Sequence, residues 1–306
     1  MLYPTHKANG KLLLTAEYFV LDGANAIALP TKFGQYLQVE INSQSGPFIQ
    51  WISLDALQNS WLNIHINSNL SADSSDEISY RLIDILKVCI DLNPCKLDLT
   101  ESYIFTTQID FDRSWGLGTS STLIRLLADF FEINPYILLE KTFGGSGYDI
   151  ACANMHGPLL YNNKTPYNPE IVPIHLNKTY FDAVFFVYLG NKQNSRDGMK
   201  HYRSLNLDKL TIIQDIEDIN NQILQSEKLV EFEKAIEEHE RIISSNLQIP
   251  RLSETLFKDY WGSVKSLGAW GGDFVLMTND RPVEEFIQYL KNKHMNVYFP
   301  FREIIN

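Results

Sequence analysis

Apolar and polar residues alternate along the first third of the chain, as they do in half-buried β-strands. Strand-like runs are predicted at residues 11–20, 36–41 and 103–109. Asp22-Gly23 and Gly34 supply turn signals between the first two runs. Residues 77–88 follow a different period, because their apolar positions recur every three or four residues, and this spacing predicts a helix.

The second half of the chain contains more predicted helix. Residues 207–245 are acidic, with charges between apolar positions at helical spacing, which predicts a solvated helical region. The pattern also predicts strands at 183–189 and 295–299, and helices at 253–265 and 283–293. Prolines crowd the stretch 162–173, which is predicted to join two domains, 1–165 and 170–306. Because helices and strands mix in both halves, the predicted class is α+β.

A glycine loop, WGLGTSS, stands between a predicted strand and a predicted helix at residues 115–121. Gly116 and Gly118 have no side chain, so backbone amides can approach an anion, and a helix start adds about half a positive charge. The hydroxyls of residues 119–121 can cap the helix, bind phosphate oxygens or join a magnesium shell. The pattern favours a nucleotide phosphate site, with an ordinary capped turn as the alternative. A Walker-type P-loop is excluded, because no GxxxxGK(S/T) sequence occurs.

Three other positions combine glycine with a charged residue. In GGSGYDIA, at residues 144–151, the Asp149 carboxylate can orient or deprotonate a phosphoryl acceptor, or simply cap a helix. Residues 265–273, KSLGAWGGD, predict a glycine-dense turn before a strand. Lys11 follows Gly10 at the start of the first strand, where a lone lysine is commonly a surface charge.

Composition limits the classes of function. The net charge is -11 and no basic run occurs, which argues against nucleic-acid binding. No stretch reaches the roughly 18 uncharged apolar residues of a membrane helix. The first residues lack the regions of a secretory signal, so a cytoplasmic location is expected. Cys89, Cys95 and Cys152 have no CxxC spacing, so neither a disulfide framework nor a zinc site is indicated.

These glycine-containing segments occur in the order found in GHMP kinases, which the chain resembles over nearly its whole length. Residues 8–21, ANGKLLLTAEYFVL, resemble the first family motif, and residues 115–121 resemble its GLGSS phosphate loop. Residues 265–273 resemble the glycine-rich third motif. The resemblance implies the family fold: a domain like the second domain of ribosomal protein S5, then a ferredoxin-like domain, with ATP and substrate between them.

The resemblance also implies roles for individual residues. Asp149 would orient or deprotonate the acceptor, and Lys11 would pair with the acidic substrate or with Asp149. The phosphates of ATP would bind Gly116, Leu117, Gly118, Thr119, Ser120 and Ser121. Mg²⁺ would bind Ser121 and Glu140, with Glu132 as a second candidate. Substrate contacts are expected from Lys192, Ser195, Arg196, Gly268, Ala269 and Gly271.

The implied reaction is transfer of the γ-phosphoryl group of ATP to phosphomevalonate. GSGYD at residues 145–149 and GAWGGD at 268–273 are similar to the GSGFD and GAGGGD of phosphomevalonate kinases. Mevalonate or another small alcohol is the alternative acceptor, and a nucleotide-binding pseudokinase is the alternative from another class. The expected partner is a small-molecule phosphoryl acceptor. Binding to nucleic acid or to a membrane is not expected, and the sequence does not decide whether the protein forms a homodimer.

Four positions depart from the family motifs: Asn9 replaces Pro, Ala16 replaces Gly, Thr119 replaces Ser, and Trp270 replaces Gly. Of these, Trp270 is expected to narrow the pocket or to stack on a ligand.

Overall fold

The computed structural model describes residues 2–41, 48–72, 74, 76–165, 167–176, 178–190, 195–268, 270 and 272–306. Three of the predicted substrate residues lie outside these ranges, namely Lys192, Ala269 and Gly271. The backbone of Ser195 and Arg196 is described, but their side chains are not.

The chain forms two compact units. The first comprises Met1–Gly10, Phe33–Arg113 and Leu117–Asn154. The second comprises Lys11–Lys32, Ser114–Gly116 and Met155–Asn306. Strands β1 (His6–Leu13) and β2 (Ala26–Ile41) contribute residues to both units, so the units interleave along the sequence. The predicted domains 1–165 and 170–306 stay a prediction.

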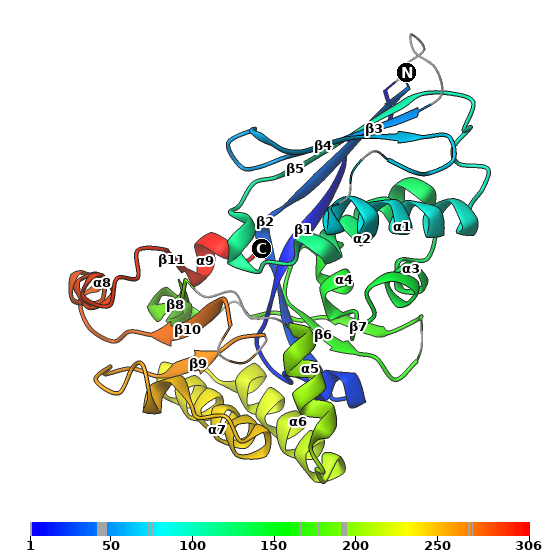
Figure 1. Cartoon of the computed structure of the whole chain (residues 1–306). Helices are drawn as coiled ribbons and strands as arrows, with labels where there is room; N and C mark the ends of the chain where they lie inside the picture. The colour runs from blue at the N-terminus through cyan, green and yellow to red at the C-terminus, as the bar shows by residue number, and fades with distance from the viewer. Residues whose placement is uncertain are drawn as a thin grey trace. The chain divides into compact units, whose positions relative to one another are not determined.

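The first unit is a sheet with helices on one side. Its strands follow the order β4-β3-β5-β2, with β3 at Phe48–Leu54, β4 at Ser60–Asn67 and β5 at Tyr103–Ile109. Strand β5 pairs antiparallel with β2 and parallel with β3. Helices α1 (Glu77–Leu92), α2 (Thr119–Phe131), α3 (Pro135–Thr142) and α4 (Tyr148–Ala153) lie on the same side of these strands (Figure 1).

The alternation of apolar residues produces the core of this unit. Alternate residues of β5 are buried, and Phe105 packs between Trp51 and Phe130, with ring centroids 5.3 Å from each. Helix α1 buries Leu82 and Leu86 against the same core, which confirms the predicted helix over 77–88. Burying one such side chain contributes about 1.5–3 kcal/mol.

The second unit contains a separate sheet of order β11-β8-β10-β9. Its strands are β8 (Val184–Tyr188), β9 (Val264–Ser266), β10 (Phe274–Thr278) and β11 (Tyr298–Pro300). The shorter strands β6 (Leu159–Asn162) and β7 (Glu170–Pro173) pair with each other, and β6 pairs with β2.

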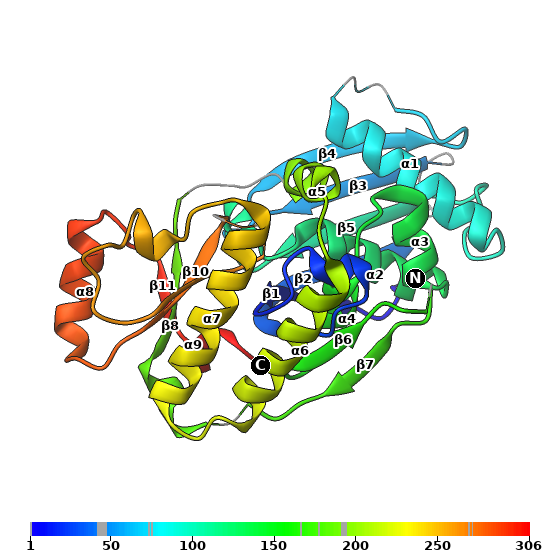
Figure 2. The same cartoon turned by 90° about the horizontal axis from the view of Figure 1, so that it is seen from below.

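The helices of the second unit are α5 (Ser195–Ser204), α6 (Lys209–Gln225), α7 (Leu229–Leu247), α8 (Val283–Asn292) and α9 (Phe301–Ile304). Helices α6 and α7 pack side by side (Figure 2). Short 3₁₀ turns occur at Phe19–Asp22, Arg113–Trp115, Thr179–Ala183 and Leu252–Glu254. Within the described ranges, no helix combines the length and hydropathy that crossing a membrane requires.

Two predicted elements differ from the structure. The strand predicted over 11–20 ends at Leu13, because Ala16 and Tyr18 take positive φ angles of 66° and 62°, which no strand accommodates. The helix predicted over 253–265 is a 3₁₀ turn followed by irregular chain and β9. In both places tertiary contacts override the local pattern.

Gly34→Ala is expected to destabilise the protein by about 1–3 kcal/mol, the usual cost of overpacking. A Cβ at this position would lie 2.3 Å from the carbonyl oxygen of Ala8, a backbone atom that cannot easily move. The matched control is Gly157→Ala, whose Cβ would meet no described atom within 4 Å. Urea unfolding of both variants measures the difference, and equal midpoints would contradict the prediction.

Candidate functional site

The predicted phosphate loop has the backbone geometry of an anion site. Gly116 and Gly118 both adopt left-handed conformations, with φ of 66° and 97°, and Gly118 is the N-cap of α2. The first N–H groups of a helix have no acceptor within the helix, so the start of α2 offers donors together with the positive end of its dipole. The loop therefore has the features expected for binding phosphate.

The hydroxyls of this loop differ in position. Ser121 is 4% exposed, and its Oγ donates to the carbonyl oxygen of Gly118 at 2.8 Å. Thr122 donates to the same carbonyl at 3.0 Å and to Gln35 Oε1 at 2.7 Å. Ser120 is exposed. The structure thus gives Ser121 a part in fixing the loop and leaves the Ser120 side chain at the surface.

Asp149 occupies the first turn of α4, after the left-handed N-cap Gly147. Its Oδ1 accepts the N–H of Ile150 at 3.0 Å, and the residue is half-buried. Helix α4 packs against α2 within the first unit. The structure therefore brings the helix that bears Asp149 onto the helix that begins at the phosphate loop.

Helix α3 adds polar groups near Asp149. Burial raises the pKa of the Tyr136 hydroxyl, the Arg125 guanidinium opposes this shift, and the charges of Asp149 and Cys152 add to it. Arg125 forms a two-point contact with Asp129, at 2.8 and 2.9 Å.

The two candidate metal ligands lie at different places. Glu140 is exposed and stands four residues after Tyr136, so the two side chains share one face of α3. Glu132 caps the far end of α2 and pairs with Lys96 at 2.5 Å, about 20 Å along the helix from the loop. Position therefore favours Glu140 over Glu132. In the part of the chain that the structure describes, no group of three or more His, Cys, Asp or Glu could hold a metal ion.

Lys11 belongs to the second unit, where it meets the glycine loop. Its Nζ donates to the carbonyl oxygen of Gly116 at 2.9 Å. A Cβ on Gly116 would lie 1.7 Å from Asp273 Oδ2, so the loop passes directly beside this carboxylate. Residues from three of the recognised motifs therefore come together here. Sequence reasoning did not assign a role to Asp273, although its place at the end of the glycine-rich segment was a signal.

The glycine-rich segment itself is described in part. Gly268 has a φ of 65°, and a Cβ there would meet no described atom within 4 Å. Trp270 is 5% exposed. Burial raises the pKa of the Tyr18 hydroxyl, and the backbone of Trp270 opposes this shift. The indole thus fills space inside the second unit, which does not support the expected stacking on a ligand.

A fully buried charged cluster lies behind this segment, and sequence reasoning missed it. Lys265 Nζ donates to Glu17 Oε1 at 2.6 Å and lies 3.7 Å from Glu240 Oε1. His239 Nε2 accepts the N–H of Ala16 at 3.0 Å, so it has no proton for Glu17 Oε2, 3.3 Å away. The His239–Glu17 approach is therefore not an ion pair. All four side chains of the cluster are at most 2% exposed.

Burial controls the protonation of this cluster. It raises the pKa of Glu240 to about 8, with Lys265 and Arg251 opposing the shift and Glu17 adding to it. Burial also raises the pKa of Glu17, again against the attraction of Lys265. Burial and Lys265 together hold the pKa of His239 well below its usual range, so the imidazole is neutral.

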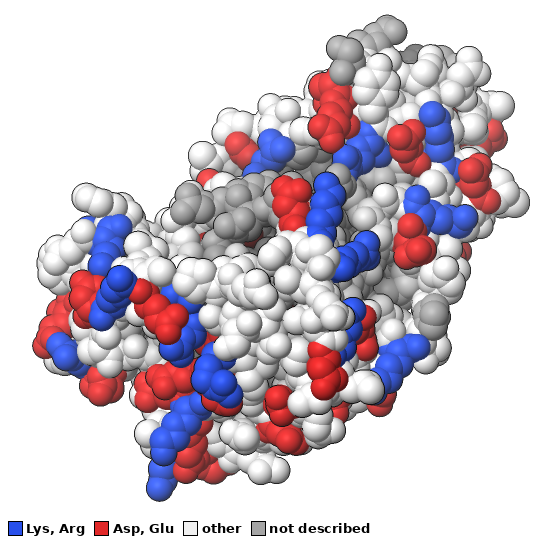
Figure 3. Space-filling view, turned by 60° about the horizontal axis from the view of Figure 1, so that its bottom comes forward, with Lys and Arg blue, Asp and Glu red and all other residues white. Residues whose placement is uncertain are grey.

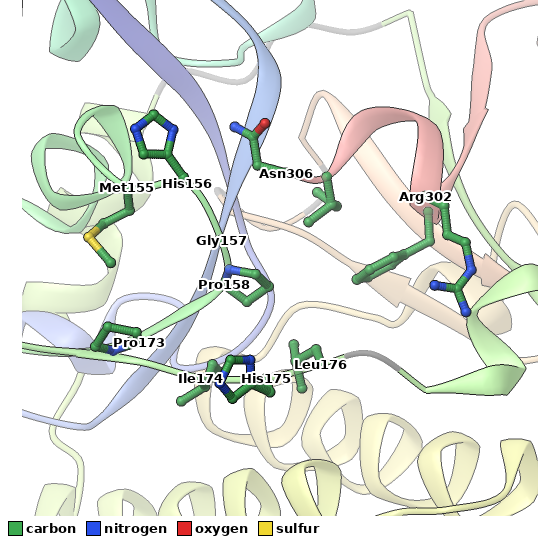
Figure 4. Close-up of a pocket in the computed structure, with 12 residues that line it drawn as sticks. Met155, His156, Gly157, Pro158, Pro173, Ile174, His175, Leu176, Arg302 and Asn306 are labelled. Carbon is green, nitrogen blue, oxygen red and sulfur yellow. The ribbon is translucent and has the colours of Figure 1, made fainter.

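The cavity in Figure 4 lies elsewhere in the second unit. Its volume is about 440 Å³, and its lining comes from residues 155–158, 173–176, 301–302 and 305–306. The Arg302 side chain at its edge donates to Asp182 at 2.5 Å and to the Lys178 carbonyl at 2.8 Å. None of the predicted site residues lines it. On the face drawn in Figure 3, positive and negative side chains are interspersed and neither sign forms a continuous patch.

Glu240→Gln is expected to flatten the pH dependence of stability. Because the pKa rises from 4.5 to about 8, the folded protein keeps a proton that the unfolded chain releases. The stability that this bound proton contributes is fully present below the pKa of Glu240 in the unfolded chain. It is lost as the pH rises through the pKa of Glu240 in the folded protein. Glutamine has no such proton, so the free energy of unfolding of the variant should fall less between about pH 5 and 8. Urea titrations at several pH values measure this, with the exposed Glu284→Gln as control; parallel curves for Glu240→Gln and wild type would refute it.

Comparisons with known proteins establish the fold. No protein-family model matches the chain, and no curated protein matches it. The structure of Streptococcus pneumoniae phosphomevalonate kinase in complex with phosphomevalonate and AMPPNP matches with a TM-score of 0.70 and 14% identity, over 97% of this chain and 99% of that chain. Methanococcus jannaschii mevalonate kinase matches with a TM-score of 0.68 and 17% identity, over 97% of each chain. Mevalonate diphosphate decarboxylase from Staphylococcus aureus matches with a TM-score of 0.62 and 14% identity, over 100% of this chain and 95% of that chain. The chain therefore has the GHMP kinase fold that its sequence resemblance predicted.

Proposed function

We propose that this chain is a kinase that transfers the γ-phosphoryl group of ATP to a small-molecule acceptor, with phosphomevalonate as the leading candidate. One observation carries the proposal: α2, which begins at the glycine loop, packs against α4, which bears Asp149 in its first turn. A phosphate site and a candidate acceptor-orienting carboxylate thus come from two helices in contact. Phosphoryl transfer needs little else from a protein except charge neutralisation and positioning.

ATP would be held by the loop from Gly116 to Ser121. The amides at the start of α2 supply donors for the phosphates, and the hydroxyl of exposed Ser120 can reach a phosphate oxygen. Mg²⁺ bound with a nucleotide needs only one or two protein ligands beside the phosphates. Glu140, exposed on α3, would be one such ligand. Ser121 could add an oxygen lone pair, because its O–H donates to the Gly118 carbonyl oxygen. Bound there, the ion would neutralise phosphate charge.

The acceptor would be oriented by Asp149. Two sequence details favour phosphomevalonate over mevalonate: the GSGYD that contains Asp149, and the acidic Asp273 that closes the third motif. The solved phosphomevalonate kinase and mevalonate kinase have the same fold as this chain, so fold alone leaves both acceptors open. Mevalonate is therefore the alternative acceptor.

A coupled ADP-release assay with Mg-ATP is expected to detect turnover with phosphomevalonate or, failing that, with mevalonate. Galactose and homoserine serve as small alcohols outside this pair. The acceptor with the highest kcat/KM identifies the substrate. ATP binding without turnover on any acceptor would instead favour a pseudokinase.

Asp149→Asn is expected to lower kcat by about 10² to 10⁴, the usual contribution of a positioned proton acceptor. If the acceptor is a phosphate, which is already anionic at neutral pH, the decrease in kcat should be close to about 10². The KM for ATP should stay unchanged, because the nucleotide site lies on α2. Asp91→Asn, an exposed change on α1, is the matched control. Wild-type kcat in Asp149→Asn would remove this residue from the mechanism.

A further inference from the structure

We propose that Lys265, through its buried contact with Glu17, is a positioning residue that holds the third glycine-rich segment in place for acceptor binding, a role that rests on the proposed kinase function. Lys265 and Glu17 are both fully buried, so neither touches a ligand directly. Their effect must pass through the backbone that they hold.

The chain around Glu17 has an unfavourable conformation that needs external support. Ala16 and Tyr18, on either side of it, both have positive φ angles, 66° and 62°, which L-residues with side chains rarely adopt. Such residues persist where the surrounding structure fixes them. We call residues 16–18 the kink.

Two residues of the kink make hydrogen bonds to other parts of the second unit. The N–H of Ala16 donates to His239 Nε2 at 3.0 Å. Glu17 Oε1 accepts from Lys265 Nζ at 2.6 Å. Burial raises the pKa of the Tyr18 hydroxyl, and the backbone of Trp270 opposes this shift. The Glu17 contact therefore joins the kink to strand β9, which contains Lys265.

Lys265 also fixes the backbone beside it. Its Nζ donates to the carbonyl oxygen of Ser266 at 3.0 Å, and the N–H of Ser266 donates to Glu240 Oε1 at 3.0 Å. Ser266 ends strand β9, and Gly268 follows with its left-handed φ of 65°. The ammonium thus holds the point at which the chain leaves the strand and turns.

The other end of the same segment reaches the candidate site. Asp273 lies against Gly116, whose carbonyl oxygen accepts from Lys11. The segment is therefore fixed by Lys265 where it begins and by Asp273 where it ends. Displacing its first part would move Gly268 and the Trp270 amide relative to Lys11, all within one compact unit.

A purely structural role is the competing explanation, and a double variant separates the two. Replacing a buried ion pair by apolar residues is often neutral for stability, whereas removing one partner is costly. Glu17→Leu with Lys265→Met should therefore regain most of the stability that Lys265→Met alone loses. It cannot regain the hydrogen bonds that hold Ser266 and the kink.

The first measurement is hydrogen exchange at the Trp270 amide, which needs no activity. We expect exchange about tenfold faster than wild type in Lys265→Met and in the double variant, because the local structure opens more often. Lys293→Met is the matched control. Lys293 Nζ likewise contacts one carboxylate, Asp259 at 2.9 Å, and one carbonyl, Leu256 at 3.0 Å, but near α8. This control should leave Trp270 exchange unchanged.

The second measurement is kinetic. In the double variant, kcat/KM for the acceptor should fall by about 10²-fold, the size expected for misplacement of about 1 Å, while the KM for ATP stays near wild type. A stable double variant with wild-type Trp270 exchange and wild-type acceptor KM would overturn the inference. Absence of turnover in the wild type would overturn the kinase proposal alone, because the exchange result still decides whether Lys265 holds the segment.

Discussion

The candidate site depends on the absence of a side chain at position 116. Gly116 has a φ of 66°, and the space that a Cβ would take is filled by the Asp273 carboxylate. The Gly116 carbonyl also receives the Lys11 ammonium. A cation, a loop backbone and an anion can meet at this point only because the loop adds no bulk of its own. Glycine is the residue that permits both the conformation and the approach.

The segments that could be recognised from sequence are those whose signal is local. Glycines at 116, 118 and 147 do adopt left-handed conformations, and the amphipathic pattern over 77–88 is helix α1. The buried pair of Glu17 and Lys265 could not be recognised, because its members are 248 residues apart and each looks like an ordinary charged residue. The kink was mistaken for strand for the same reason: the contacts that support it come from distant parts of the chain.

The fold limits the reactions that this chain could catalyse, but it does not identify which of them. Two kinases and a decarboxylase match this chain over nearly all of its length, at 14–17% identity. What distinguishes such proteins lies in the side chains placed on the common backbone. In this chain the proposed ones are an aspartate on α4 and a lysine on β1.

The buried cluster also constrains how the sequence can change over time. Glu17, His239, Glu240 and Lys265 come from three separate stretches. Lys265 donates to Glu17, while His239 and Glu240 accept the backbone N–H groups of Ala16 and Ser266. Loss of either Glu17 or Lys265 would leave the charge of the other buried and uncompensated, a costly state. Substitutions at position 17 should therefore be inherited together with substitutions at 265. Among homologues these positions would covary as a set, in spite of their distance along the chain.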